Sequence, residues 1–259
     1  MSNTLNIALL QTDLTWENPE KNRLHFSEKI DAITAQVDII VLPEMFTSGF
    51  TMHPSSVAET MDGETISWLK TTAAKKQSAI TGSLVIKEND NYYNRMVFVH
   101  PNGMVEHYDK RHTFTLAGED KIYTSGNKKI IVNYKGWKIC PLVCYDLRFP
   151  VWSRNSDHYD VLIYVASWPT VRMLAWDTLL RARAIENMSY CVGVNRVGTD
   201  ANNHEYSGHS AVYDVLGERM DSIPYSVEAV EIVTLNKEDI TFNRNKFSFL
   251  ADQDQFSIT

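Results

Sequence analysis

The sequence predicts an α/β fold of four layers, an α-β-β-α sandwich in which two stacked sheets are covered on their outer faces by helices. Two observations predict it. Helical patterns alternate with nearly unbroken apolar runs early and late in the chain, as at residues 37–42 and 161–166, and such runs are typical of strands buried on both faces. Between these regions, shorter alternating runs separated by turn residues indicate an antiparallel meander.

The first helix is predicted from its start signal. Asn18 followed by Pro19 is typical of a helix beginning, because the asparagine side chain caps the helix and proline fits its first position. Apolar residues then recur with rough helical spacing to about residue 35: Leu24, Ile30 and Ile33. The run at 37–42 that follows is too short for an ordinary helix and too apolar for a half-exposed strand, so we expect a fully buried strand.

The remaining elements follow the same two patterns. Helical periods predict helices at 63–77 and 173–190, the second of which has one expected core face: Leu174, Asp177, Leu180, Ala184 and Met188. Strands are expected at the other apolar or alternating runs: 6–10, 79–86, 95–100, 104–108, 130–134, 137–143, 161–166, 191–197, 210–214 and 227–235. Residues 236–259 show no strong period and are expected to form a C-terminal arm that packs on a partner subunit.

Composition limits the classes of function. The 259 residues are 44% hydrophobic and carry no linker or low-complexity tract, so we expect a single domain over 1–259. The net charge of −7 and the lack of a Lys/Arg stripe with interleaved aromatics argue against a nucleic-acid partner. No stretch reaches the about 18–20 apolar residues of a membrane span, and the N-terminus does not resemble a signal peptide. We therefore expect a cytoplasmic protein with neither nucleic-acid nor membrane partners.

The three cysteines of the chain differ in position. Cys144 ends the predicted strand 137–143 and precedes a polar, turn-prone stretch, which places its thiol at the rim of a sheet, where a nucleophile needs to lie. Cys140 and Cys191 lie inside apolar strands and are interpreted as inert core residues. An odd, sparse set of cysteines is typical of a reducing cytoplasm. No Cys/His cluster with ligand spacing supports a metal pair at Cys140 and Cys144, so no metal is predicted.

Two other charges follow predicted strands and could complete a site with Cys144. Glu44 comes shortly after the run 37–42, and Lys110 comes after the strand 104–108. A carboxylate can accept the proton of a thiol, and an ammonium group can stabilise a developing oxyanion. Taken singly, Glu44 could be a surface carboxylate or a helix-start residue, and Lys110 is better explained as a solvated lysine in a polar stretch.

Together, four segments resemble the nitrilase superfamily of carbon–nitrogen hydrolases, which use Glu, Lys and Cys. The segments are Leu42-Pro43-Glu44-Met45-Phe46, Tyr108-Asp109-Lys110-Arg111-His112, Cys144-Tyr145-Asp146-Leu147-Arg148-Phe149-Pro150, and Ala182-Arg183-Ala184-Ile185-Glu186-Asn187. They occur in the family's order and span essentially the whole chain. The resemblance implies that Cys144 is the nucleophile and Glu44 the general base. It also implies that Lys110 and the backbone N–H of Tyr145 form the oxyanion hole, with no metal or organic cofactor.

The resemblance adds one further residue and a branch of the family. Glu119 occupies the place of a second glutamate, which would orient Lys110 or the substrate amide, although a solvated loop carboxylate is the alternative. Tyr145-Asp146 after the cysteine resembles the omega-amidase and carbamoylase-like branches, and the stretches 144–155 and 42–50 look like bacterial omega-amidases. Many relatives have glutamate where Val151 stands, so no carboxylate role is assigned there.

The omega-amidase resemblance implies small substrates such as 2-oxoglutaramate and 2-oxosuccinamate, which carry a terminal amide and a distal carboxylate. We expect Arg148 to bind that carboxylate, or alternatively to form a structural ion pair with Asp146 or Glu186. Phe46 and Trp168 are expected to wall the pocket, although packing is the plainer role for either.

Two other functions stay open at this point. An N-carbamoyl amino-acid hydrolase, or a hydrolase of other small aliphatic amides, would use the same three residues with a different pocket. A catalytically silent binding protein on the same fold is the alternative from another class, and the presence of all three residues argues against it. The resemblance also implies a homodimer.

Overall fold

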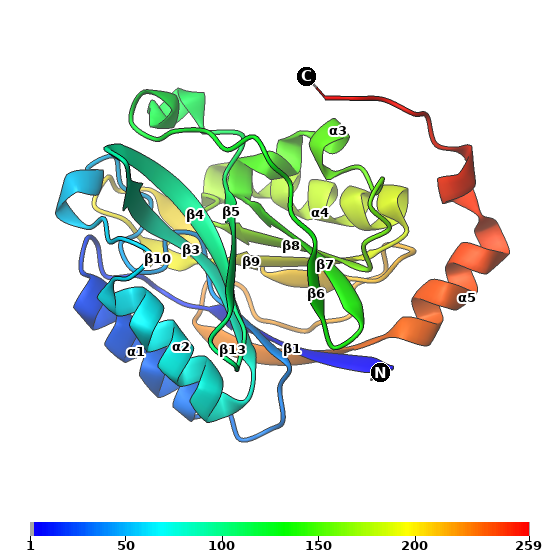
Figure 1. The fold of residues 1–259 in the computed structure, drawn as a ribbon, viewed down its shortest axis with the longest axis horizontal. Coiled ribbons are helices and arrows are strands. Elements are labelled where there is room, and N and C mark those ends of the chain that lie inside the picture. The colour runs from blue at the N-terminus through cyan, green and yellow to red at the C-terminus, as the bar shows by residue number, and fades with distance from the viewer. Residues whose placement is uncertain (1–2, 259) are drawn as a thin grey trace.

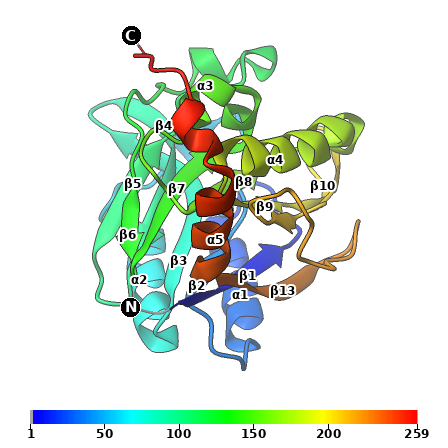
Figure 2. The same ribbon diagram turned by 90° about the vertical axis from the view of Figure 1, so that its right-hand side faces the viewer.

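The computed structural model describes residues 3–258 and confirms the predicted four-layer sandwich, with two sheets face to face and helices outside them (Figure 1, Figure 2). Residues 1, 2 and 259, which belong to the ends of the predicted domain and of the C-terminal arm, lie outside the described part. Helices α1 (Pro19–Asp31) and α2 (Glu64–Lys76) cover the first sheet, whereas α3 (Pro150–Ser153) and α4 (Met173–Asn187) lie on the second.

The first sheet has six strands in the order β13-β1-β2-β3-β4-β5. They are β1 (Thr4–Gln11), β2 (Ile39–Val41), β3 (Ala79–Glu88), β4 (Asn91–Val99), β5 (Val105–Asp109) and β13 (Ala229–Asn236). Strands β1, β2 and β3 are parallel, and β3, β4 and β5 form the predicted antiparallel meander. Asn89 and Asp90 both have positive φ, 48° and 65°, which gives the tight two-residue turn between β3 and β4 the twist that a hairpin needs.

The second sheet has five strands in the order β12-β9-β8-β7-β6. They are β6 (Val132–Tyr134), β7 (Trp137–Val143), β8 (Val161–Ala166), β9 (Tyr190–Asn195) and β12 (Ala211–Tyr213). A separate short pair, β10 (Val197–Thr199) with β11 (Glu205–Ser207), was not predicted beyond Val197, since both strands are too short to give an alternating signal.

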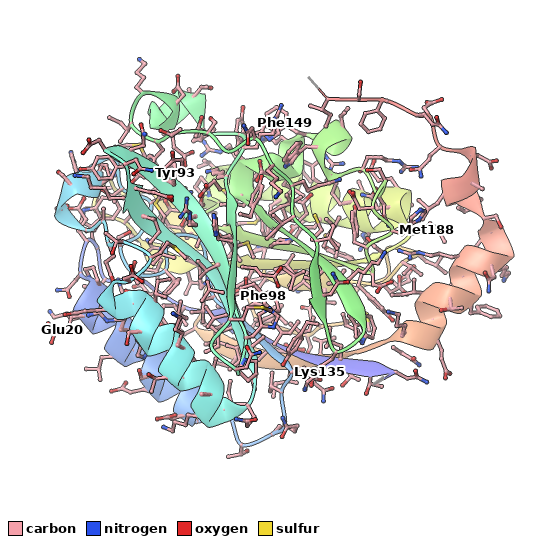
Figure 3. All side chains as sticks on the ribbon, in the orientation of Figure 1. Glu20, Tyr93, Phe98, Lys135, Phe149 and Met188 are labelled. Carbon is pink, nitrogen blue, oxygen red and sulfur yellow. The ribbon has the colours of Figure 1, made fainter. Side chains whose placement is uncertain are left out.

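The main core lies between the sheets. In β1, Ile7 and Leu9 face the second sheet, whereas Ala8 and Leu10 face α1 and α2, so both faces of the strand are covered. Phe98 of β4, labelled in Figure 3, reaches across to Tyr134 of β6, and the ring centroids are 5.7 Å apart. This double coverage explains why the central strands read as unbroken apolar runs.

Two helical faces differ from the prediction. Leu24 and Leu174, expected in the core, are 62% and 83% exposed. The helices instead bury polar residues that form hydrogen bonds with neighbouring loops. Asn22 of α1 binds the backbone carbonyls of two loops, and Arg183 of α4 donates to the Leu147 carbonyl at 2.6 Å. A search for apolar period alone misses such a face.

The C-terminal segment, in which the sequence shows no strong period, contains helix α5 (Lys237–Phe247). The Asn236 side chain caps it by accepting from the Glu238 N–H, and Arg244 donates to the carbonyls of Met188 and Tyr159. These contacts fix the arm along its own chain (Figure 2). Within residues 3–258, no helix has the length and apolar character to cross a bilayer.

Candidate active site

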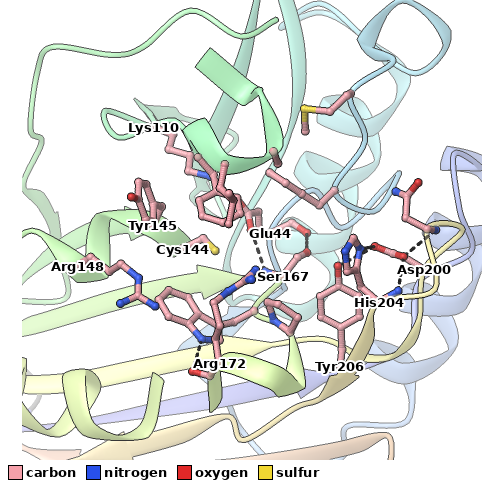
Figure 4. A pocket seen from close by; sticks show the side chains of 18 residues that line it. Glu44, Lys110, Cys144, Tyr145, Arg148, Ser167, Arg172, Asp200, His204 and Tyr206 are labelled. Carbon is pink, nitrogen blue, oxygen red and sulfur yellow. Dashed lines mark hydrogen bonds and ion pairs between the residues drawn. The ribbon is translucent and has the colours of Figure 1, made fainter. Parts of the chain in front are cut away.

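A cavity of about 360 Å³ lies where strands of both sheets end (Figure 4). Glu44 follows β2, Lys110 directly follows β5, Cys144 directly follows β7, and Ser167 directly follows β8. All four line the cavity. The three residues predicted from separate segments are therefore brought together, because the two sheets present these strand ends to the same space.

Lys110 lies between two carboxylates at the base of this site. Its Nζ is 2.9 Å from Glu44 Oε1 and 2.8 Å from Glu119 Oε2, and all three side chains are buried. Asn94 Nδ2 donates to both carboxylates, at 2.8 Å and 3.2 Å. Glu119 is thus part of the site, and its alternative as a solvated loop carboxylate is excluded.

The charge states in this cluster follow from burial and from the close charges. Burial alone would lower the pKa of Lys110, but the negative charges of Glu119 and Glu44 outweigh it and hold that pKa above its ordinary value. Burial raises the pKa of Glu119, with the nearby Glu44 adding to the rise and Lys110 opposing it. Lys110 therefore stays an ammonium group at neutral pH, as an oxyanion partner needs to be.

Cys144 lies in a strained turn directly after the end of β7. Its φ of 45° is left-handed, and a 3-10 helix at Cys144–Arg148 begins at once, which turns the half-buried thiol toward the cavity. Burial and then the charge of Glu44 raise the pKa of the thiol well above its ordinary value, and Lys110 only partly opposes them. The resting thiol is protonated at neutral pH and needs a base to become a nucleophile.

Glu44 is held in the position such a base requires. Its Oε2 accepts from the Ser167 backbone N–H at 2.8 Å, and its Oε1 accepts from Asn94 and Lys110. After burial, the charge of the same carboxylate is the largest influence that raises the pKa of the Cys144 thiol, and both residues line the cavity. Three fixed groups therefore orient the Glu44 carboxylate.

Asp146, buried two residues after the cysteine, ties the cysteine loop to the lysine loop. It accepts from Tyr108 Oη at 2.8 Å, from His112 Nδ1 at 2.8 Å, and from the backbone N–H groups of His112 and Val143. Tyr108 and His112 flank Lys110 in sequence, and Val143 precedes Cys144. One carboxylate thus sets the distance between the two loops.

We predict that Asp146→Ala lowers the free energy of unfolding by about 3–5 kcal/mol, because four donors, two of them buried and two half-buried, lose their acceptor. Denaturant titration measures it. Asp120→Ala, which removes an exposed carboxylate of the nearby loop, is the control and should leave the midpoint unchanged. A loss below about 1 kcal/mol for Asp146→Ala would mean that this network contributes little to the fold.

The residues expected around the substrate are placed unevenly. Arg148 and Trp168 line the cavity, with the Arg148 guanidinium 4.9 Å from the Trp168 ring. The ion pairs considered for Arg148 do not form, since Asp146 binds His112 and Glu186 binds Arg183. The expectation that Phe46 walls the pocket is wrong.

Phe46 points away from the cavity into the layer under the helices. It is fully buried against Phe26 and Trp68. The backbone of Met45 has a φ of 44°, so the chain reverses right after Glu44 and carries the next side chain to the far side of the sheet. Phe50 takes the expected place, with its ring 5.2 Å from Lys110 Nζ.

Several lining residues were missed. Arg172 lies in the turn before α4, and Asp200, His204 and Tyr206 lie in or near the β10–β11 hairpin. Nothing in their local sequence marks them, because loop residues reach a cavity only through the fold. Cys140 and Cys191, interpreted as core residues, are fully buried.

Comparisons with known proteins agree with this geometry. A family model described as carbon-nitrogen hydrolase matches residues 6–245. The omega-amidase YafV of Yersinia enterocolitica is 43% identical over 253 residues, 98% of each chain. The 2-oxoglutaramate amidase of Bacillus subtilis is 33% identical over 216 residues, 82% of this chain and 83% of the relative.

A solved structure gives the same result. XC1258 from Xanthomonas campestris, described as a CN-hydrolase superfamily protein with an arsenic adduct in the active site, has a TM-score of 0.97 and 39% identity over 100% of both chains. The chain therefore belongs to the carbon–nitrogen hydrolase family, the nitrilase superfamily, on its omega-amidase branch. Members of this class cleave amide carbon–nitrogen bonds by hydrolysis, and this chain is such an enzyme.

Proposed function

We propose that this enzyme hydrolyses the terminal amide of short 2-oxo dicarboxylic acid monoamides, such as 2-oxoglutaramate and 2-oxosuccinamate, to the acid and ammonia. The observation that carries the proposal is the convergence of a thiol, a carboxylate and an ammonium group in one cavity that also contains arginines. The relatives described as omega-amidase and 2-oxoglutaramate amidase support the same substrate class.

The first step forms a carbon–sulfur bond. Cys144 attacks the amide carbon while Glu44 takes its proton, which the raised pKa of the thiol makes necessary at neutral pH. The amide oxygen becomes negative in the tetrahedral intermediate. Lys110 and the backbone N–H of Tyr145 stabilise that oxygen, and one such donor is worth roughly 3–4 kcal/mol in acyl-transfer enzymes.

The second step releases ammonia and then the acid. Glu44 passes its proton to the leaving nitrogen, and the carbon–nitrogen bond breaks to leave a thioester on Cys144. Water, activated by the same carboxylate, attacks the thioester and frees the thiol. Glu119 keeps Lys110 in place throughout through their 2.8 Å contact. Each step uses only groups of the protein chain and water, so the proposal requires neither a metal nor an organic cofactor.

Parallel assays test the substrate class. Ammonia release from 2-oxosuccinamate is expected to exceed, in kcat/KM, hydrolysis of an N-carbamoyl amino acid and of a nitrile by at least 100-fold (about 3 kcal/mol). Preference for the N-carbamoyl compound would favour the carbamoylase alternative. No turnover of any of them, together with a Cys144 thiol that does not react with a stoichiometric electrophile, would favour a silent binding protein.

The proposal includes the organisation of the enzyme. We infer a single-domain cytoplasmic homodimer. Exposed apolar residues on α4 and α5 support pairing: Leu174, Ile185 and Phe242.

A further inference from the structure

We propose that Arg172 is a second anion anchor which, with Arg148, holds the acid end of the substrate between two guanidinium groups. The pair selects amides that end in a carboxylate and rejects those that carry an ammonium group at the same end. The inference rests on the proposed function and adds a residue that the sequence did not indicate.

The two arginines are the charged groups of the cavity that have no charged partner. Both line the cavity and are half-buried, and within residues 3–258 neither side chain makes an ion pair or a hydrogen bond. By contrast, Arg183 and Arg196, which are buried nearby, each bind a carboxylate. A half-buried guanidinium group without a counter-ion in the free enzyme is suited to an anionic ligand.

Aromatic rings hold both guanidinium groups in place. Arg148 lies 4.9 Å above the Trp168 ring, and Arg172 lies 5.1 Å above the Phe114 ring. Trp168 also contacts the second arginine, since its Nε1 donates to the Arg172 carbonyl at 2.9 Å. One buried indole thus supports both anchors, while the guanidinium N–H groups stay available for a carboxylate.

The carboxylates of the cavity are already occupied. Glu44 lines the cavity and binds Lys110, as does Glu119, which does not line it. Asp200, which lies across the cavity from Arg148 in Figure 4, accepts from Tyr206 Oη at 2.8 Å, from His204 Nδ1 at 3.2 Å, and from two backbone N–H groups. Burial acts to raise the pKa of Asp200, but these hydrogen bonds outweigh it and lower the pKa. The carboxylate is therefore ionised and already hydrogen-bonded.

An incoming ammonium group would therefore meet two guanidinium groups and no open carboxylate. A substrate with a 2-oxo group or an unsubstituted carbon next to its carboxylate avoids this repulsion. The cavity is suited to 2-oxo acid amides and unsuited to the corresponding amino acids, glutamine and asparagine.

Three four-carbon amides separate these effects: succinamate carries the carboxylate, butyramide replaces it with a methyl group, and asparagine adds an ammonium group. Arg172→Met should lower kcat/KM for succinamate roughly 10- to 100-fold, because charge-assisted hydrogen bonds are lost. It should change kcat/KM for butyramide by less than about 2-fold. The wild type should prefer succinamate to asparagine by at least about 100-fold.

Arg181→Met is the matched control. Arg181 is on α4, also lies over an aromatic ring, at 5.3 Å from Tyr213, and is outside the cavity. The Arg181→Met variant should have the wild-type kcat/KM for all three substrates. Equal losses on succinamate and butyramide in Arg172→Met, or no loss on either, would overturn the anchor, as would wild-type turnover of asparagine at the rate of succinamate.

A binding measurement keeps this test independent of catalysis. Succinate is titrated calorimetrically into the Cys144→Ala variant and into the double variant Cys144→Ala/Arg172→Met. The dissociation constant should be at least about 10-fold larger for the double variant. Equal binding by the two proteins would overturn the anchor even if the enzyme is active. Weaker binding in a protein whose wild type hydrolyses none of the three amides would instead overturn the proposed function and leave the anchor supported.

Discussion

Cys144→Ala is expected to abolish amide hydrolysis, lowering kcat by at least about 10,000-fold, while the folded structure is retained. No other group in the cavity can form the carbon–sulfur bond on which both steps depend. The thiol is half-buried at the end of a strand, so its loss leaves little empty volume. Alanine occupies the left-handed backbone position at 144 about as well as cysteine does. Ammonia release and thermal unfolding measure the two outcomes.

Cys140→Ala provides the matched control for this result. Cys140 lies four residues earlier, inside β7, and its side chain is completely buried in the core. Its truncation should lower the unfolding temperature and leave kcat within about 2-fold. Hydrolysis by Cys144→Ala at a measurable fraction of the wild-type rate would remove Cys144 from the mechanism.

Glu44→Gln is expected to be nearly as severe, with kcat lowered about 1,000-fold or more. The amide keeps the size of the side chain but cannot accept the thiol proton, and the thiol is protonated because its pKa is raised. Lys110 keeps Glu119 as its counter-ion, so the variant is expected to fold. Single-turnover measurement of ammonia release reports the formation of the thioester, which includes the attack and the loss of ammonia, separately from its hydrolysis.

Glu119→Gln makes the same chemical change on the other side of the same lysine. It removes one negative partner of Lys110 and leaves the carboxylate beside the sulfur in place. A smaller loss is expected, since the base remains and only the support of the ammonium group is weakened. If Glu44→Gln released ammonia in a single turnover as fast as the wild type, another base would have to act.

The sequence predicted those parts of the site that are local. Glu44, Lys110 and Cys144 each follow an apolar run, and a charge or thiol at the end of a buried strand can be recognised without a structure. That the three ends meet depends on how the two sheets stack, and only the resemblance to a family predicted this meeting. The same strand patterns predicted the meander and the order of the layers.

Other parts depend on backbone geometry or on distant contacts. Phe46 was misplaced because a left-handed Met45 reverses the chain, and no residue type marks that turn. Helix α5 was missed because a cap and two arginine hydrogen bonds, rather than an apolar period, stabilise it. Arg172 was missed because the feature that marks it, a guanidinium group without a counter-ion, can be recognised only in the folded structure.

The central claim is that an acyl group passes through a thioester on Cys144, and partitioning with hydroxylamine tests it most directly. Succinamate and the monomethyl ester of succinic acid would give the same thioester from different leaving groups. At one hydroxylamine concentration, the ratio of hydroxamate to free acid is predicted to be identical for the two substrates, and both products should disappear in Cys144→Ala. A ratio that changes with the leaving group, or hydroxamate formed at the wild-type rate without Cys144, would contradict the mechanism.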